Sequence, residues 1–270
     1  MQLQHAIKNG ALILANEAVV PVTSRAVQYG FSTYESLRVI GGRPIHLGDH
    51  LERLENSCKG IGLVHPFTKE EITGWVEELI EADAIDDATL RIQLYGGENP
   101  ILFVLASTIL SYPDSFYTEG VGAISYEGER LIPSCKTGNL LLNYMALEEA
   151  KAKGCFEALL IDRHGYLLEG TRSNFFAFSE GVLHTAPDDL VLLGITRDAV
   201  IRAAGQLGIE VVYQPIALGD VLGGRYDELF ISATSMAAMP LRRLDERLFT
   251  AKFDRTRAIK ELVRRWENGG

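Results

Sequence analysis

The sequence predicts a two-domain protein that mixes helices and strands, with an α+β part followed by an α/β part. Its length of 270 residues exceeds that of most single domains, and 47% hydrophobic with 23% charged residues is ordinary for a well-packed globular protein. Strand-like and helical patterns alternate along the chain and are interrupted by a turn-rich stretch. We therefore expect a smaller α+β domain at residues 1–112, an interdomain linker at 113–122 and a larger α/β domain at 123–270.

The smaller domain is predicted to be a sheet covered by two amphipathic helices. Apolar residues recur at helical spacing within 51–61 and again within 72–80. Strand patterns bounded by turn residues occupy 11–14, 37–40, 89–95 and 101–110. Gly41-Gly42 predicts a hairpin directly after the second of these strands.

The larger domain is predicted to alternate strands with helices. Strand patterns lie at 157–162, 174–178, 210–213 and 228–232, and helical patterns at 144–153, 196–207 and 252–266. The linker is placed before this domain because Pro113, Asp114 and two glycines leave no periodicity there.

Composition excludes several classes of partner. A net charge of -10 opposes nucleic-acid binding, which depends on clustered Lys and Arg. No apolar stretch is long enough for a membrane helix, and the start of the chain lacks the pattern of a secretion signal. Three unpatterned cysteines predict reduced thiols, and six scattered histidines predict no metal site. We expect a cytoplasmic protein with neither nucleic acid nor membrane as partner.

Familiar nucleotide-binding, hydrolase and zinc-protease motifs are absent from the sequence, and two local phosphate signals remain. Gly194-Ile195-Thr196 precedes an amphipathic helix, whose first amides can bind an anion. Thr196 can equally be a simple helix cap. The loop 232–235 follows an apolar strand and is equally a Ser/Thr turn. From the residues alone, Lys136 is an ordinary lysine.

Five segments in order resemble the class IV aminotransferases, which are pyridoxal-phosphate enzymes of fold type IV. The most specific is Glu-Gly-x-x-x-Asn-hydrophobic-Phe at 169–176, followed by Gly-Ile-Thr-Arg at 194–197. The others are His50-Leu51-Glu52-Arg53-Leu54, Lys136 and Ser232-Ala233-Thr234. The resemblance spans nearly the whole chain, and it implies two α/β-type domains, pyridoxal 5'-phosphate in the interdomain cleft and a homodimer.

The resemblance also implies roles for particular residues. Lys136 would hold the cofactor as a Schiff base and then shuttle a proton as the acid/base catalyst. Glu169 would face the pyridine nitrogen and keep it protonated, which strengthens the ring as an electron acceptor. The cofactor phosphate would be bound by Arg53, the amides of Ile195 and Thr196, and the hydroxyl of Thr234.

The substrates implied are small molecules: an amino acid, chiefly a branched-chain or other apolar L-amino acid, and a 2-oxo acid, with glutamate as partner. Tyr34-Glu35 resembles the transaminases of the family, whereas the lyases carry small hydroxyl residues at the position of Glu35. Tyr34, Arg38, Arg91 and Ser235 are expected at the substrate, with Arg91 resembling the arginine that engages a distal carboxylate.

Departures from the family patterns keep alternatives open. Leu141 stands where branched-chain enzymes carry a tyrosine, and Ala237-Ala238-Met239 replaces their Glu-Ile-Thr. The Arg-x-His pair of the D-amino-acid enzymes is missing near 100–103. Aminodeoxychorismate lyase and D-amino-acid aminotransferase remain alternatives, and outside the class a non-catalytic protein that binds pyridoxal phosphate or another phosphate ligand.

Overall fold

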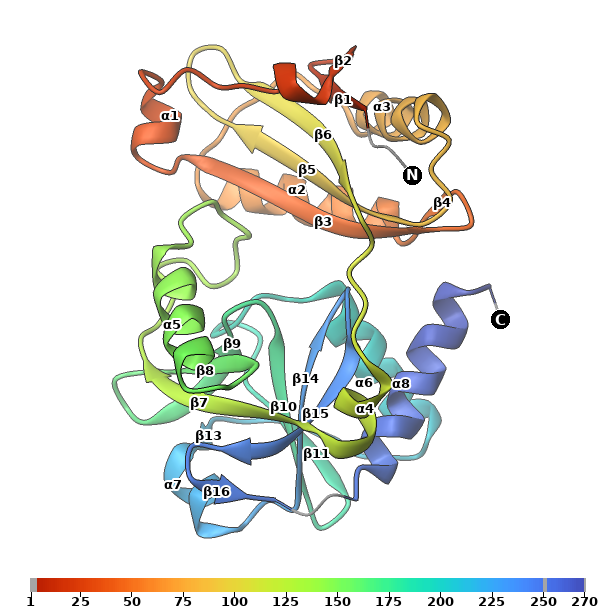
Figure 1. Cartoon of the computed structure of the whole chain (residues 1–270). Coiled ribbons are helices and arrows are strands. Elements are labelled where there is room, and N and C mark those ends of the chain that lie inside the picture. The colour runs from red at the N-terminus through yellow and green to blue at the C-terminus, as the bar shows by residue number, and fades with distance from the viewer. Residues whose placement is uncertain (1–3, 250–251, 270) are drawn as a thin grey trace. The chain divides into compact units, whose positions relative to one another are not determined.

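The computed structural model describes residues 4–249 and 252–269, and the chain forms two compact units (Figure 1). The first comprises Met1–Leu110 with Cys135–Asn139, and the second comprises Ser111–Ser134 with Leu140–Gly270. The segment expected to be a linker at 113–122 instead holds helix α4 (Asp114–Glu119) and the start of a strand, both in the second unit. Pro113 and Gly120 flank this helix, and Tyr117 is buried, so the turn residues mark helix ends.

The first unit is built on one antiparallel sheet of six strands. In spatial order these are β2 (Ala11–Leu14), β1 (His5–Lys8), β6 (Ile101–Ser107), β5 (Ala88–Tyr95), β3 (Ser32–Ile40) and β4 (Arg43–Pro44). The predicted hairpin joins β3 to β4, whereas β6 ends three residues before the predicted strand end.

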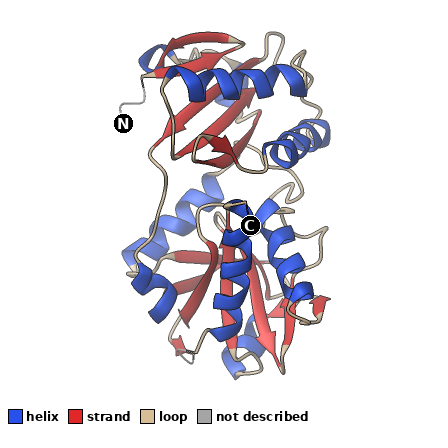
Figure 2. Ribbon diagram, turned by 90° about the vertical axis from the view of Figure 1, so that its right-hand side faces the viewer, coloured by secondary structure: helices blue, strands red, loops and turns tan. Residues whose placement is uncertain are grey.

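Two helices cover one face of this sheet (Figure 2). They are α2 (Leu47–Gly60) and α3 (Lys69–Ala82), and the shorter elements are η1 (Ala15–Glu17) and α1 (Arg25–Gln28). Leu51, Leu54 and Cys58 of α2 pack with Leu37 of β3 in the core, as the helical spacing predicts. Thr68 caps α3 through the amide of Glu71.

The sheet's other face carries the polar residues of β3. Burial alternates along this strand, so Tyr34, Ser36 and Arg38 share one face while Glu35 and Leu37 point to the helices. The strand begins at Ser32 and thus includes the whole segment singled out in the sequence.

The second unit contains a sheet of ten strands, part of which closes on itself. They are β7 (Val121–Glu127), β8 (Glu157–Ile161), β9 (Tyr166–Gly170), β10 (Asn174–Ser179), β11 (Val182–Thr185), β12 (Val211–Tyr213), β13 (Ile216–Ala217), β14 (Glu228–Ala233), β15 (Ala237–Leu244) and β16 (Arg247–Leu248). The path β10-β14-β15-β7-β8-β9 becomes a ring because Glu169 of β9 pairs with Asn174 of β10.

Apolar side chains fill the ring and anchor helices to its outside. Phe175, Ile231 and Leu241 belong to the inner cluster. Helices α6 (Ile195–Gln206) and α8 (Asp254–Glu267) pack over Phe176 and Phe230, while α5 (Leu141–Ala152) packs over β7 and β8. Helix α7 (Leu218–Gly223) lies beside β13. Strands β7, β9, β11, β13, β15 and β16 were not predicted.

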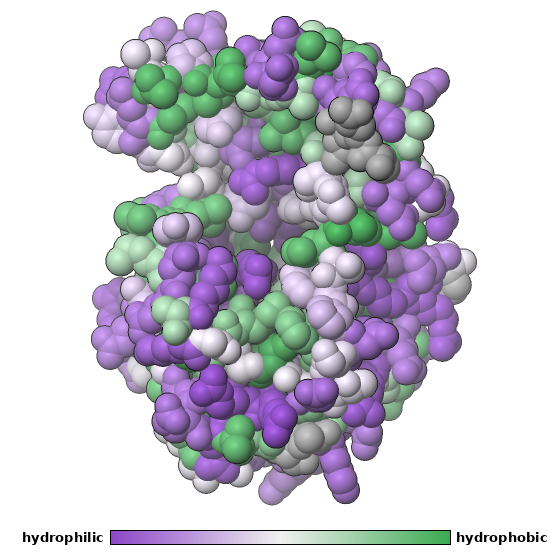
Figure 3. Space-filling model, viewed as in Figure 1, coloured by the Kyte–Doolittle hydropathy of each residue, from purple (hydrophilic) through white to green (hydrophobic). Residues whose placement is uncertain are grey.

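Most of the face shown in Figure 3 is hydrophilic, and hydrophobic residues lie there in separate groups. Among residues 4–249 and 252–269, no helix has the length and apolar character needed to cross a membrane. In the same ranges, no cluster of three or more His, Cys, Asp or Glu side chains could hold a metal ion.

Candidate functional site

Lys136 is held beside β3 by backbone hydrogen bonds. The Tyr34 amide donates to the Lys136 carbonyl at 3.1 Å, and the Lys136 amide donates to the Ser57 hydroxyl at 2.9 Å. An antiparallel bridge joins Thr33 to Thr137. A Cβ added at Gly60 would lie 2.3 Å from the sulfur of Cys135, so α2 approaches this segment closely. These contacts place Lys136 in the first unit, although the chain before Cys135 and after Asn139 belongs to the second.

The side chains of Lys136 and Arg91 both lie against the ring of Tyr34. Lys136 Nζ is 4.5 Å and Arg91 Cζ is 4.0 Å from the ring centroid. Arg91 also donates through Nε and Nη2 to the side-chain oxygen of Gln93, at 2.9 and 2.8 Å. The fold therefore brings together three of the residues predicted for the site.

Arg38 lies on the same face of β3 as Tyr34, four residues farther along the strand. Because a strand rises by about 3.3 Å per residue, the two Cα atoms are roughly 13 Å apart. Arg38 pairs with Thr89 in the sheet register, whereas Tyr34 pairs with Gln93. Arg38 thus lies on the same face of β3 as Tyr34, at a different point along the strand.

Arg53 forms a buried ion pair with Glu35. Its Nε and Nη2 atoms donate to the two carboxylate oxygens at 2.8 and 2.7 Å, and His50 Nδ1 lies 2.7 Å from Glu35 Oε2. Burial by itself would raise the pKa of Glu35, but the hydrogen bonds and charges of Arg53 and His50 lower it to about 2. Burial lowers the pKa of His50, against the opposing effect of Glu35. Glu35 is therefore an anion that fixes the arginine.

Glu169 lies in the second unit, near the point where the ring of strands closes. It is 5% exposed, and its oxygens accept hydrogen bonds from Arg130 Nη1 and from the Leu192 amide, each at 3.2 Å. Arg130 is itself held by the Pro133 carbonyl. Glu169 lies within strand β9.

Helix α6 begins at Ile195, so Thr196 is its second residue and not its cap. The cap is Gly194, and the first hydrogen bond of the helix runs from the Asp198 amide to the Gly194 carbonyl. The amides of Ile195 and Thr196 precede that bond and point out of the helix start. A Cβ at Gly194 would lie 2.2 Å from Asn174 Oδ1, so a larger residue there would displace the Asn174 side chain.

Thr234 and Ser235 form the tight connection between β14 and β15. Arg264 of α8 binds both carbonyls, at 3.3 Å for Thr234 and 2.8 Å for Ser235. The Ser235 hydroxyl is 3.3 Å from that of Tyr112. Ala237 ends the turn at φ +55°, a left-handed conformation usual after short hairpin turns.

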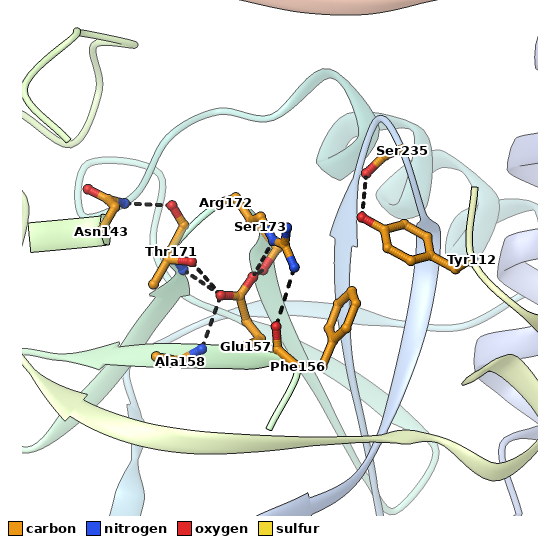
Figure 4. A network of polar contacts seen from close by, with 9 residues as sticks. All are labelled: Tyr112, Asn143, Phe156, Glu157, Ala158, Thr171, Arg172, Ser173 and Ser235. Atoms are coloured by element: carbon orange, nitrogen blue, oxygen red, sulfur yellow. Dashed lines mark hydrogen bonds and ion pairs between the residues drawn. The ribbon is translucent and has the colours of Figure 1, made fainter. Parts of the chain in front are cut away.

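A network around the fully buried Glu157 holds the loop that follows Glu169 (Figure 4). Its carboxylate accepts hydrogen bonds from the hydroxyls of Thr171 and Ser173 and from two amides, while Arg172 Nε is 3.8 Å away. Burial raises the pKa of Glu157, and these donors offset only part of the effect. Asn143 donates to the Thr171 carbonyl at 2.6 Å and ties the loop to α5.

The donor groups of the second unit fit a ligand with a phosphate and an aromatic nitrogen. The Ser232 hydroxyl is buried and finds no hydrogen-bond partner among the described residues. It pairs in register with Asn174, whose side chain donates to the Leu192 carbonyl at 2.8 Å, so the hydroxyl lies near the Gly194 turn. A helix start, hydroxyls and a buried carboxylate match the chemistry expected of a pyridoxal-phosphate site.

Sequence patterns missed several supporting residues. Arg130 has no motif around it, and Glu157 lies in a strand that reads only as apolar. His50 could have been found, because residues three apart on a helix share a face and His50 precedes Arg53 by three.

Comparison with known proteins identifies the kind of protein that carries these groups. The Amino-transferase class IV family matches residues 32–244. The D-alanine aminotransferase of Bacillus licheniformis is 30% identical, over 88% of this chain and 87% of its own.

Solved structures agree in fold over the whole chain. The branched-chain aminotransferase of Thermoproteus uzoniensis, solved with norvaline, is 30% identical with a TM-score of 0.90 and covers 98% of this chain and 95% of its own. The branched-chain amino acid aminotransferase of T.th., solved with pyridoxamine 5'-phosphate, is 27% identical with a TM-score of 0.91, over 100% and 95%. It has also been solved with N-(5'-phosphopyridoxyl)-L-glutamate.

Proposed function

The chain belongs to the class IV aminotransferase family, and we propose that it uses pyridoxal 5'-phosphate to move an amino group between an apolar L-amino acid and a 2-oxo acid. Branched-chain amino acids are the first substrates to test, with glutamate as partner. The observation that carries the proposal is that Lys136 Nζ and the Arg91 guanidinium both lie against the ring of Tyr34. The relatives solved with norvaline and with phosphopyridoxyl-L-glutamate support it.

Six residues would hold the cofactor. Lys136 and Arg53 come from the first unit, and Glu169, Ile195, Thr196 and Thr234 come from the second. Arg53 would give the phosphate a charged partner, and the amides at the start of α6 would add hydrogen bonds. The Glu169 carboxylate would hold a proton at the pyridine nitrogen. Bound pyridoxal phosphate supplies an electron sink for the negative charge that develops at the substrate Cα.

Lys136 would be the catalytic residue in this arrangement. Its amine would hold the cofactor and would carry a proton to and from the substrate Cα. The Lys136 carbonyl and amide are fixed by Tyr34 and Ser57, so the side chain starts from a defined backbone position.

The substrate would lie against the polar face of β3. Tyr34 offers an aromatic wall for an apolar side chain, and the Arg91 guanidinium can pair with a carboxylate such as that of glutamate. Arg38 lies farther along the same face, and Ser235 of the second unit would complete the set of substrate contacts.

A D-amino-acid aminotransferase is the second candidate, favoured by the 30% identity to a D-alanine aminotransferase. The remaining alternatives are an aminodeoxychorismate lyase and a non-catalytic protein for a phosphate ligand. We further propose a homodimer that works in the cytoplasm without nucleic-acid or membrane partners.

Amino transfer to 2-oxoglutarate from L-leucine, L-valine and D-alanine separates these candidates. We expect L-leucine and L-valine to react, D-alanine to be inert, and Lys136→Ala to abolish transfer. Reaction of D-alanine alone would favour the second candidate. Formation of pyruvate from aminodeoxychorismate without amino transfer would identify a lyase, and failure of every substrate would contradict the proposal.

A further inference from the structure

Glu35 faces away from the side of β3 that would meet the substrate. Tyr34, Ser36 and Arg38 share one face of the strand, and Glu35 lies between them on the opposite face. Its side chain is fully buried against α2, where Arg53 and His50 reach it. A substrate lying against Tyr34 therefore cannot touch Glu35, although the sequence pattern links residue 35 to the type of reaction.

Two side chains of one helix face converge on the Glu35 carboxylate. Arg53 uses Nε and Nη2 in a two-point contact of 2.8 and 2.7 Å, which fixes the plane of the guanidinium. His50 Nδ1 lies 2.7 Å from the oxygen that Nη2 also contacts. Exposed side-chain fractions of 1% for His50 and 11% for Arg53 show that only the arginine reaches toward the surface.

We propose that Glu35, with the support of His50, is a positioning residue for the cofactor phosphate. By holding Nε and Nη2 of Arg53, it sets the direction of the remaining N–H groups of the guanidinium. This inference rests on the proposed function, since the phosphate in question is that of pyridoxal phosphate. Residue 35 then acts on the reaction through the cofactor and not through the substrate.

The physical reason is the cost of ordering a long side chain. A lysine or arginine side chain that is free to rotate loses considerable rotamer entropy on binding, whereas an arginine already clamped by a carboxylate loses little. Replacing Glu35 with glutamine keeps the size but removes the charge and leaves one acceptor for two donors. Arg53 would then be both less fixed and incompletely paired in a buried place.

Equilibrium titration of the cofactor-free protein with pyridoxal phosphate and with pyridoxal, which lacks the phosphate, tests this role. We expect Glu35→Gln to weaken the binding of pyridoxal phosphate by about tenfold or more and the binding of pyridoxal by less than about twofold. Loss of a supporting partner has an effect of this size on metal affinity at metal sites. Glu55→Gln, on the same helix but half-exposed, should change neither. Glu35→Gln combined with Arg53→Leu should be no worse than Arg53→Leu alone.

The outcomes separate this inference from the proposed function. If Arg53→Leu binds pyridoxal phosphate as tightly as the native protein, the phosphate role of Arg53 fails and this inference with it. If Arg53→Leu shows the selective loss and Glu35→Gln does not, only the role of Glu35 is refuted. Equal weakening of both ligands by Glu35→Gln would show a merely structural role and would also refute it.

A second variant covers the case in which Glu35→Gln does not fold. His50→Gln leaves the ion pair between Glu35 and Arg53 in place and disturbs only the bond from Nδ1. A selective loss of affinity for pyridoxal phosphate supports the positioning role. An unchanged ratio of the two affinities overturns it.

Discussion

The two compact units supply different kinds of group to the proposed chemistry. The first offers ionisable side chains, Lys136, Arg53 and Arg91, whose directions are set by other side chains. The second offers the amides at the start of α6, loop hydroxyls and the buried Glu169. The orientation of a flexible side chain such as that of Lys136 or Arg53 depends on the contacts that hold it. An anion site made of backbone amides depends instead on the backbone conformation, and a glycine at the helix start lets a ligand approach those amides closely.

One buried carboxylate in each unit shows the same contrast. Glu35 and Glu157 are both fully buried, yet the pKa of Glu35 is lowered to about 2 while that of Glu157 is raised. Glu35 has a two-point hydrogen bond to Arg53, whereas Glu157 has hydroxyl and amide donors and only a longer contact, 3.8 Å, with the more exposed Arg172. An arginine in direct two-point contact outweighs the penalty of burial, and neutral donors with a more distant arginine do not.

The largest effect on the rate of amino transfer is expected from Lys136, the residue of the first unit that we propose moves the proton. Lys136→Ala should lower the rate of amino transfer by about 10³-fold or more, because the variant lacks the group that moves the proton. Steady-state kinetics with saturating cofactor measures this. Lys153→Ala is the matched control, since that lysine is exposed and pairs with Glu149 at the end of α5. Equal rates for the native protein and Lys136→Ala would assign proton transfer elsewhere.

The next largest effect should come from the backbone of the second unit. Gly194→Ala places a Cβ 2.2 Å from Asn174 Oδ1 and 3.4 Å from the Arg197 amide, so either the Asn174 side chain, which donates to the Leu192 carbonyl, or the start of α6 must move. We expect affinity for pyridoxal phosphate to fall by about tenfold, the equivalent of about 1.4 kcal/mol, in an equilibrium titration. Gly205→Ala, in the same helix with nothing within 4 Å, should leave affinity unchanged and favour folding. Similar affinities for both variants would remove α6 from the site.

The smallest expected effect is on the pH dependence of the free energy of unfolding, to which Glu35 and Glu157 contribute with opposite signs. Glu35 ionises more easily in the folded state, so its contribution is present above pH 4.5 and is lost as the pH falls toward 2. A change from 4.5 to about 2 corresponds to about 3 kcal/mol in total, of which about 0.8 kcal/mol is lost by pH 4. For Glu157 the raised pKa gives the opposite sign, and stability is lost as the pH rises through 4.5.

Urea unfolding of the native protein, Glu35→Gln and Glu157→Gln between pH 6 and pH 4 measures these contributions. The difference in free energy of unfolding between the native protein and Glu35→Gln should shrink as the pH falls. As the pH falls from 6 to 4, the free energy of unfolding of the native protein should rise relative to that of Glu157→Gln. Parallel curves for the two variants would contradict the contrast between the carboxylates.

Periodicity predicted the elements whose burial has a simple pattern. Helices α2 and α3 follow from one apolar face each, and β2 coincides with its predicted bounds. The ring of strands did not follow, because β7, β9 and β15 are joined by pairings between distant segments that no local pattern specifies. The predicted linker was misplaced because Pro113 and Gly120 mark helix ends as well as flexible turns.

Candidate site residues could be named from the sequence where a motif carries them, and not where they act by support. Lys136, Arg53, Glu169 and Thr196 were named through their resemblance to a family pattern, and their roles remain proposals. The face on which Glu35 lies could be read only from the register of β3 with β5 and its contacts to α2. Arg130 and Glu157 act through distant partners, so spacing in the sequence gives no sign of them.

Absorption spectroscopy of the purified protein with added pyridoxal phosphate tests the central claim, that Lys136 binds the cofactor for amino transfer. We predict a visible band for the lysine-linked cofactor, its absence in Lys136→Ala, and its conversion to the pyridoxamine spectrum when L-glutamate is added. A band that persists in Lys136→Ala, or no band in the native protein, would contradict the claim.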